Sequence, residues 1–112
     1  MLRIEVKREE ELFNLILQGE VDASNSVNLD SAMAEIIRQG AKRILVDGRE
    51  LEYISSAGLG VFMSYLDEFQ ESETKMVIFG LNEKVYQVFV ILGLDKLITI
   101  KAEKEEALDI LK

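Results

Sequence analysis

The sequence contains no cysteine and no histidine. Without cysteine the chain has no disulfide, no thiolate nucleophile and no thiolate metal site. Without histidine it lacks the commonest general base and the commonest metal ligand. We therefore expect a binding protein rather than an enzyme, with no metal or cofactor of its own.

Long apolar runs and an excess of basic residues are also absent. No segment approaches the roughly 18 apolar residues of a membrane span, and the alternating start Met1–Lys7 differs from a signal-peptide core. We expect a cytoplasmic protein without direct membrane insertion. The net charge of −8 argues against nucleic acid, which is bound through clustered Lys and Arg. The negative charge is compatible with a basic protein partner, or it simply keeps the domain soluble.

The 112 residues, 48% of them hydrophobic, are enough for one domain spanning residues 1–112 with a real core. There is no linker, repeat or low-complexity segment, and no proline. Leu2, Ile4 and Val6 alternate with charged residues, and Phe13, Leu15 and Leu17 resume the alternation beyond a charged turn at Glu9–Glu11. This pattern predicts an opening hairpin.

Helix and strand patterns alternate after the hairpin, which predicts parallel pairing with helices packed on the sheet. We expect an α/β fold, or α+β if all helices lie on one face, with a mixed sheet of about five strands and about four helices. The expected elements are a helix from Ser24–Ser26 to about Gln39, a strand Arg43–Asp47, a loop Gly48–Ile54, a helix from about Ala57 to Glu71, a strand Lys75–Phe79, a helix Glu83–Leu92, a strand Leu97–Ile100 and a helix Glu103–Leu111.

Within that pattern, the helix from Ala57 is expected to turn Leu59, Phe62, Met63, Leu66 and Phe69 inward, and the next helix to bury Leu92. The start of the helix from Ala57 carries Ser55 and Ser56, where unpaired helical N–H groups favour a serine cap. Gly58 and Gly60 follow inside the first turns. Each helical glycine costs about 1 kcal/mol relative to alanine, so both need a reason, such as close approach by the sheet or by a partner.

Catalytic interpretations of this stretch fail on missing residues. Ser55 or Ser56 as a nucleophile needs a neighbouring base, and no Ser-x-x-Lys motif is present. The Gly58–Gly60 pair lacks the third glycine of a dinucleotide loop, because position 63 is methionine. The carboxylate pairs Glu20/Asp22 and Glu50/Glu52 have a spacing that is common by chance.

Two interpretations of the serines then stand side by side. One serine is an ordinary N-cap, or a serine hydroxyl accepts a phosphate of about −1.5 to −2 charges. A helix N-terminus tolerates that charge. A partner packed against Leu59 and the glycines would be repelled by it, in a neighbourhood that already holds Asp22, Glu50 and Glu52. The stretch is therefore a candidate charge switch for binding.

Ser55–Gly60 resembles the pattern Asp-Ser-(Ser or Thr)-Gly-Leu-Gly of the STAS domain family, particularly the bacterial anti-sigma factor antagonists. Gly19–Asp22 resembles the Gly-Glu-Leu-Asp that follows their second strand, and the tail resembles theirs at Leu92–Leu94, Ile98 and Glu105–Leu108. The resemblance covers the whole chain. Aligned on the glycines, it implies phosphorylation at Ser56, while Ser55 replaces the family's aspartate and is the second choice.

The resemblance further implies a partner switch. The unphosphorylated protein would bind a serine kinase that is also an anti-sigma factor, and so free a sigma factor. The kinase, which holds the ATP, would phosphorylate Ser56 and release the protein, and a metal-dependent serine phosphatase would reset it. The implied docking residues are Glu20, Asp22, Ser55, Ala57, Gly58 and Leu59.

Two further functions remain open from the sequence. One is a non-phosphorylated STAS subunit or scaffold in a lipid-transport or signalling assembly. The other is a domain that binds a nucleotide or another small ligand near residues 55–60.

Overall fold

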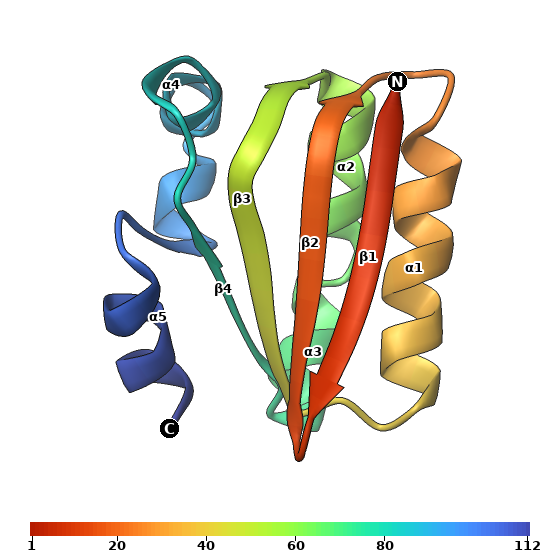
Figure 1. Cartoon of the computed structure of the whole chain (residues 1–112), viewed down its shortest axis with the longest axis vertical. Coiled ribbons are helices and arrows are strands. Elements are labelled where there is room, and N and C mark those ends of the chain that lie inside the picture. Colours follow the sequence, from red (N-terminus) through yellow and green to blue (C-terminus); the bar gives the residue numbers. More distant parts are fainter.

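A computed structural model describes all residues, 1–112. One five-stranded sheet runs in the order β1-β2-β3-β4-β5, with β1 antiparallel to β2 and every other neighbouring pair parallel (Figure 1). The strands are β1 (Leu2–Glu9), β2 (Leu12–Val21), β3 (Arg43–Ile54), β4 (Lys75–Phe79) and β5 (Thr99–Lys101). The helices are α1 (Ser26–Arg38), α2 (Ser56–Ser64), α3 (Leu66–Ser72), α4 (Glu83–Ile91), the short 3-10 helix η1 (Leu94–Lys96) and α5 (Lys104–Leu111).

The predicted hairpin and the helix α1 are confirmed. The β1–β2 turn has Glu10 in the left-handed region at φ 57°, where the chain reverses over two residues. In α1 the residues Leu29, Met33 and Ile36 form a buried stripe that faces the core. Gly40 ends the segment with φ +85°, a conformation that glycine adopts without steric cost.

The predicted loop Gly48–Ile54 is wrong, because β3 continues through it to Ile54. Leu51 and Ile54 are buried and keep the strand on the core. The pairing with β2 shifts register between Ile16 and Gln18 and again between Gly19 and Glu20, and each shift inserts one extra residue of β3. Such a bulge bends a strand without ending it, and this is how the charged residues Arg49 and Glu50 fit into a strand.

The predicted single helix from Ala57 to Glu71 is instead two helices, α2 and α3, separated at Tyr65. The N–H of Tyr65 donates to the carbonyl of Phe62 at 3.3 Å, the tightened geometry of a helix end. The break turns Met63 outward, where it is 46% exposed, so its expected inward position is wrong. Leu92 is likewise exposed, because α4 ends at Ile91.

The last strand is also shifted relative to the prediction, from Leu97–Ile100 to Thr99–Lys101. The preceding residues form η1, and Leu97 is exposed. The chain reaches the edge of the sheet only after this extra turn.

Helices cover both faces of the sheet, which settles the fold as α/β. One large apolar cluster joins the sheet to α1, α2, α3 and α4 through residues such as Leu29, Leu59 and Phe89. A smaller cluster joins Leu45, Val77 and Phe79 on the other face to α5. In Figure 1, α1 and α2 lie behind the sheet and α5 stands on the near side, leaving much of β1 and β2 uncovered.

Candidate functional site

The candidate site lies where the parallel strands β2 and β3 end together. Val21 pairs with Ile54 at the last position of both strands, and the N–H of Ser55 donates to the carbonyl of Val21 at 2.8 Å. α2 starts at the next residue. The carboxyl ends of parallel strands are the usual place for binding sites in α/β folds, and here they present the start of α2 beside the β2–α1 loop (Figure 1).

Ser55 is the N-cap of α2. Its backbone is extended, at φ −88° and ψ 172°, and its hydroxyl oxygen accepts a hydrogen bond from the N–H of Gly58 at 3.3 Å. Aspartate is an equally good cap, because its side chain accepts the same bond. An aspartate at position 55, as in the family pattern, would be able to make the same cap.

Ser56 is the first residue within α2 and is exposed. Its hydroxyl makes no hydrogen bond to the rest of the chain, whereas the hydroxyl of Ser55 is occupied. The N–H groups of the first helical turn have no intrahelical acceptor, so Ser56 and the half-buried Ala57 lie where backbone donors face outward. The two neighbouring serines thus differ in accessibility and in hydrogen bonding.

Gly58 has an intramolecular reason to be glycine. A Cβ atom at this position would lie 2.6 Å from Cγ1 of Val21 and 2.8 Å from Cγ1 of Ile54, closer than carbon atoms approach. Leu59 is 1% exposed and packs in the large core cluster. Its side chain therefore lies inside the protein and is not part of the surface on which the sequence placed it.

Gly60 has no such reason. It is exposed, and a Cβ atom there would meet nothing within 4 Å. The glycine therefore keeps this part of the α2 surface flat without relieving any internal clash.

Asp22 shapes the loop between β2 and α1. Its Oδ1 accepts hydrogen bonds from the N–H of Ser24 at 2.9 Å and from the Ser24 hydroxyl at 2.6 Å. In return, Oδ1 of Asn25 accepts from the N–H of Asp22 at 2.9 Å. The bond from the Ser24 hydroxyl is the main reason that the pKa of Asp22 lies below its ordinary value. Glu20, two residues earlier, leaves its side chain exposed.

Two exposed apolar side chains at this end of the molecule were not among the expected site residues. Val27, in the first turn of α1, is 63% exposed, and Tyr53, paired with Glu20 at the end of β3, is 44% exposed. The sequence assigned Tyr53 to a loop and Val27 to an ordinary helix. An aromatic residue beside the serine stretch was the available signal, since tyrosine is enriched in protein interfaces.

Comparisons with known proteins identify the family of the chain. The STAS domain model matches residues 3–107. The anti-sigma-B factor antagonist of Listeria monocytogenes is 29% identical over 101 residues, 89% of each chain. The chain belongs to the STAS domain family.

Solved structures establish the same fold. An anti-sigma factor antagonist from Mycobacterium paratuberculosis superposes with a TM-score of 0.90 at 15% identity, over 99% of this chain and 94% of that one. The anti-sigma factor antagonist SpoIIAA, from Bacillus, has a TM-score of 0.80 in its unphosphorylated form at 23% identity, over 96% and 95% of the two chains. SpoIIAA has also been solved in a phosphorylated form. In the present chain, no helix combines the length and apolar character needed to cross a membrane.

Proposed function

We propose that the protein is an anti-sigma factor antagonist whose binding is switched off by phosphorylation at Ser56. The main observation behind the proposal is that the two serines at the start of α2 have different roles. Ser55 is committed to capping the helix, while Ser56 is exposed and its hydroxyl is free. The relative from Listeria monocytogenes is named an anti-sigma-B factor antagonist and aligns with 89% of this chain, which supports the same function.

The proposed partner is a serine kinase that also acts as an anti-sigma factor. Binding of this protein would occupy the kinase and release the sigma factor. The kinase would supply ATP and transfer its γ-phosphoryl group to the Ser56 hydroxyl, with the hydroxyl proton lost and ADP leaving. A metal-dependent serine phosphatase would hydrolyse the ester and restore binding.

The docking face is assigned to the exposed groups around Ser56. Glu20 contributes polar contact, and the half-buried Ala57 and the exposed Gly60 contribute a flat helix surface. The exposed side chains of Val27 and Tyr53 provide apolar contact area. Asp22 and Ser55 hold the loop and the helix start in place. Gly58 and Leu59 act from beneath, by fixing α2 against the ends of β2 and β3.

Electrostatics explains how a single phosphate would break the complex. The start of α2 stabilises the added charge, so the free protein keeps its fold. A docked kinase would have to cover the dianion beside Glu20, and covering an unpaired charge is costly. Dissociation follows because the phosphate destabilises the complex more than the free protein.

The test compares Ser56→Ala and Ser56→Asp in calorimetric binding to the kinase encoded in the same genome. We expect Ser56→Ala to bind like wild type but to resist phosphorylation. Ser56→Asp should bind at least about tenfold more weakly, since buried like charges cost several kcal/mol. Ser64→Asp is the matched control, because it adds the same charge to an exposed serine about 12 Å further along α2.

Equal affinity of Ser56→Asp and Ser56→Ala for the kinase would contradict the switch. Such a result, together with no phosphopeptide containing Ser56 in cells, would favour the alternative of a non-phosphorylated STAS subunit or scaffold in a lipid-transport or signalling assembly.

A further inference from the structure

Asn14, in the middle of β2, is the only polar side chain among the 29 buried residues. It is 9% exposed, and its amide makes no hydrogen bond to any other group of the protein. The protein has no fully buried side-chain nitrogen or oxygen without a partner, so the amide atoms of Asn14 reach solvent. The amide therefore takes its hydrogen-bond partner from outside the chain, either water or a bound solute.

The side chain of Asn14 points away from the large core cluster. Its neighbours Phe13 and Leu15 belong to that cluster, and successive side chains of a strand face opposite sides of the sheet. On the other side, Asn14 lies beside Lys7 of β1 and Leu45 of β3. There it helps to line a cavity of about 160 Å³ at the boundary between the uncovered part of the sheet and the start of α5.

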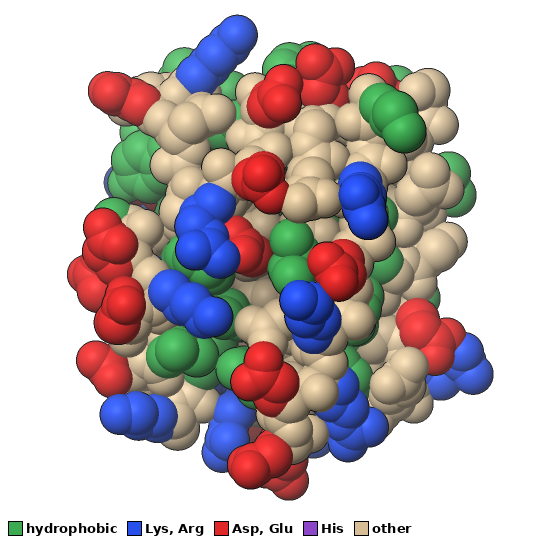
Figure 2. Space-filling model, in the orientation of Figure 1, with side chains coloured by type: hydrophobic (Ala, Val, Ile, Leu, Met, Phe, Trp, Pro, Cys, Tyr) green, Lys and Arg blue, Asp and Glu red, His purple; other side chains and the backbone are tan.

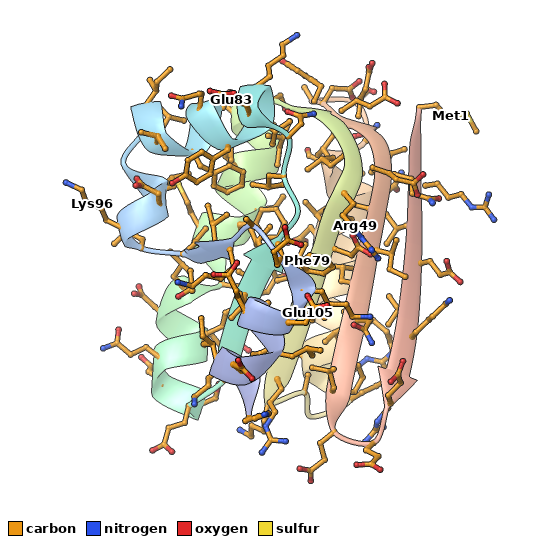
Figure 3. The ribbon with its side chains drawn as sticks, turned by 60° about the vertical axis from the view of Figure 1, so that its left-hand side comes forward. Met1, Arg49, Phe79, Glu83, Lys96 and Glu105 are labelled. Atoms are coloured by element: carbon orange, nitrogen blue, oxygen red, sulfur yellow. The ribbon has the colours of Figure 1, made fainter.

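Two of the charged groups around this cavity neutralise each other. Nη2 of Arg49 lies 2.8 Å from Oδ2 of Asp47, and Nε of Arg49 donates to Oδ1 at 3.1 Å. The guanidinium also sits 5.1 Å above the ring of Phe79. Burial pushes the pKa of Asp47 up, but the hydrogen bonds from Arg49 outweigh it and hold this pKa below the ordinary value. The two side chains therefore form an ionised pair with a fixed geometry. Figure 3 shows Arg49 beside Phe79.

The remaining lining charges are Lys7, Lys104 and Glu9. Lys104, the first residue of α5, has no ion-pair partner, and Lys7 has only a loose contact of 3.8 Å with the exposed Glu5. Among the lining residues alone, three basic groups stand against two acidic groups, while Glu5 contacts Lys7 and Glu105 acts on Arg49 from outside the lining. Figure 2 shows this mixture of basic and acidic side chains around apolar groups on the open sheet face.

We propose that this cavity binds a small oxyanion, the carboxylate or phosphate group of a small molecule. The Asn14 amide N–H₂ would donate to one oxygen, and the ammonium groups of Lys7 and Lys104 would balance its charge. Hydrogen bonds to an ionised group are roughly twice as strong as neutral ones. An anion would therefore satisfy the buried amide better than water does.

The proposed anion site is separate from the switch around Ser56. The residues that fix α2, Leu59 and Phe62, belong to the cluster on one face of the sheet. Phe79, which lines the cavity, belongs to the cluster on the other face. Occupation of the cavity is therefore compatible with a partner docked at the start of α2, and the site does not depend on the proposed function.

The test is an NMR titration of the ¹⁵N-labelled full chain. Inorganic phosphate and acetate are added in separate arms, with ionic strength held constant by sodium chloride. We expect saturable shifts of the Asn14 side-chain amide and of the backbone near Lys7 and Lys104. Saturation by phosphate alone assigns the site to phosphate groups, saturation by acetate alone assigns it to carboxylates, and saturation by both supports a general oxyanion site.

Variants locate the binding. Asn14→Leu and Lys104→Gln should each weaken the anion about tenfold or more, the loss of one charge-assisted contact. Lys84→Gln, an exposed lysine on α4, removes the same charge elsewhere and should leave the affinity within about twofold of wild type. Lys104→Gln keeps the test valid if Asn14→Leu alters folding, because Lys104 is exposed.

Several results would overturn the proposal. Shifts that grow linearly with either anion indicate only general ionic effects. Equal affinities of Lys104→Gln and Lys84→Gln, or an Asn14→Leu protein that binds like wild type, place the anion elsewhere. If the resonance of the Asn14 amide shifts with neither anion, water is its hydrogen-bond partner.

Discussion

Ser55 and Ser56 are adjacent in sequence but have separable roles in α2. Replacing Ser55 with alanine removes the oxygen that accepts from the N–H of Gly58. The free energy of unfolding should fall by about 1 kcal/mol, measured by urea denaturation. Ser55→Asp should stay close to wild type, because aspartate caps equally well. A full loss of stability in Ser55→Asp would show that the cap is not what serine supplies here.

Ser55→Ala should nevertheless still be phosphorylated by the kinase, since the proposed acceptor is Ser56. Phosphopeptide mapping after incubation with kinase and ATP checks this directly. A phosphate found on Ser55 in the wild-type protein would reverse the assignment.

Tyr65 ties the break between α2 and α3 to α1. Its hydroxyl donates to Oδ1 of Asp30 at 2.8 Å. Burial, together with this bond and the charge of Asp30, raises the pKa of Tyr65 to about 12 from 10.0. Between these pH values the folded state binds more protons than the unfolded state, so stability falls as the pH rises.

Tyr65→Phe should remove this pH dependence. Urea unfolding between pH 9 and pH 11.5 should show the wild type losing stability more steeply than the variant. At pH 7 the variant should be less stable by about 1 kcal/mol, the value of one hydrogen bond. Parallel pH profiles for the two proteins would mean that burial and the contact with Asp30 do not raise the pKa of Tyr65.

At the scale of the element, the two glycines of α2 form a matched pair with opposite expectations. Gly58→Ala places a methyl group 2.6 Å from Val21 and should destabilise the fold by about 1–3 kcal/mol. Gly60→Ala meets nothing within 4 Å and should stabilise the helix by up to about 1 kcal/mol. Thermal and urea unfolding of both variants measure the two changes in stability. A stabilising Gly58→Ala would mean that α2 has room to move off the sheet.

Gly60→Ala also bears on docking. A variant that folds better but binds the kinase more weakly would show that the flat surface at Gly60 serves the partner. The same affinity as wild type would leave this glycine without a binding role.

The elements differ in how well their sequences predict them. The hairpin and α1 follow clear periodicity and β4 is a short apolar run, and the bounds of all three agree closely with the prediction. The predicted strand ends too early, at Asp47, whereas β3 continues. The three charged residues between Arg49 and Glu52 are typical of a loop, and the sequence does not reveal the bulge opposite Ile16 and Gln18. The break at Tyr65 coincides with a contact to Asp30, 35 residues away, which local periodicity does not contain.

At the scale of the whole molecule, phosphorylation of Ser56 should leave the fold intact. The modified residue is exposed at a helix start, where negative charge is favourable. We expect NMR shift changes confined to the ends of β2 and β3 and the start of α2, with β4, β5 and α5 unchanged. Widespread changes would instead indicate a switch that acts by rearranging the domain.

The position of the candidate site was predictable from the sequence, but its surface was not. Capping and glycine patterns located the start of α2, and the arrangement of parallel strands follows from alternating elements. Which side chains face outward depends on how α2 lies on the sheet. That packing buries Leu59, and a one-dimensional pattern does not fix the rotation of a two-turn helix. The exposed Val27 and Tyr53 come from two other elements, α1 and β3.

Met1, which directly precedes β1, is held at the same end of the molecule. The N–H of Glu20 donates to the carbonyl of Met1 at 3.1 Å, and the carbonyl fits only because Gly19, at φ +98°, has no side chain there. Figure 1 shows the N-terminus at the end of the sheet where α2 starts, with the C-terminus at the opposite end. A purification tag or fluorescent fusion placed before Met1 would therefore crowd the kinase, whereas one placed after Lys112 leaves that end of the domain open for binding assays.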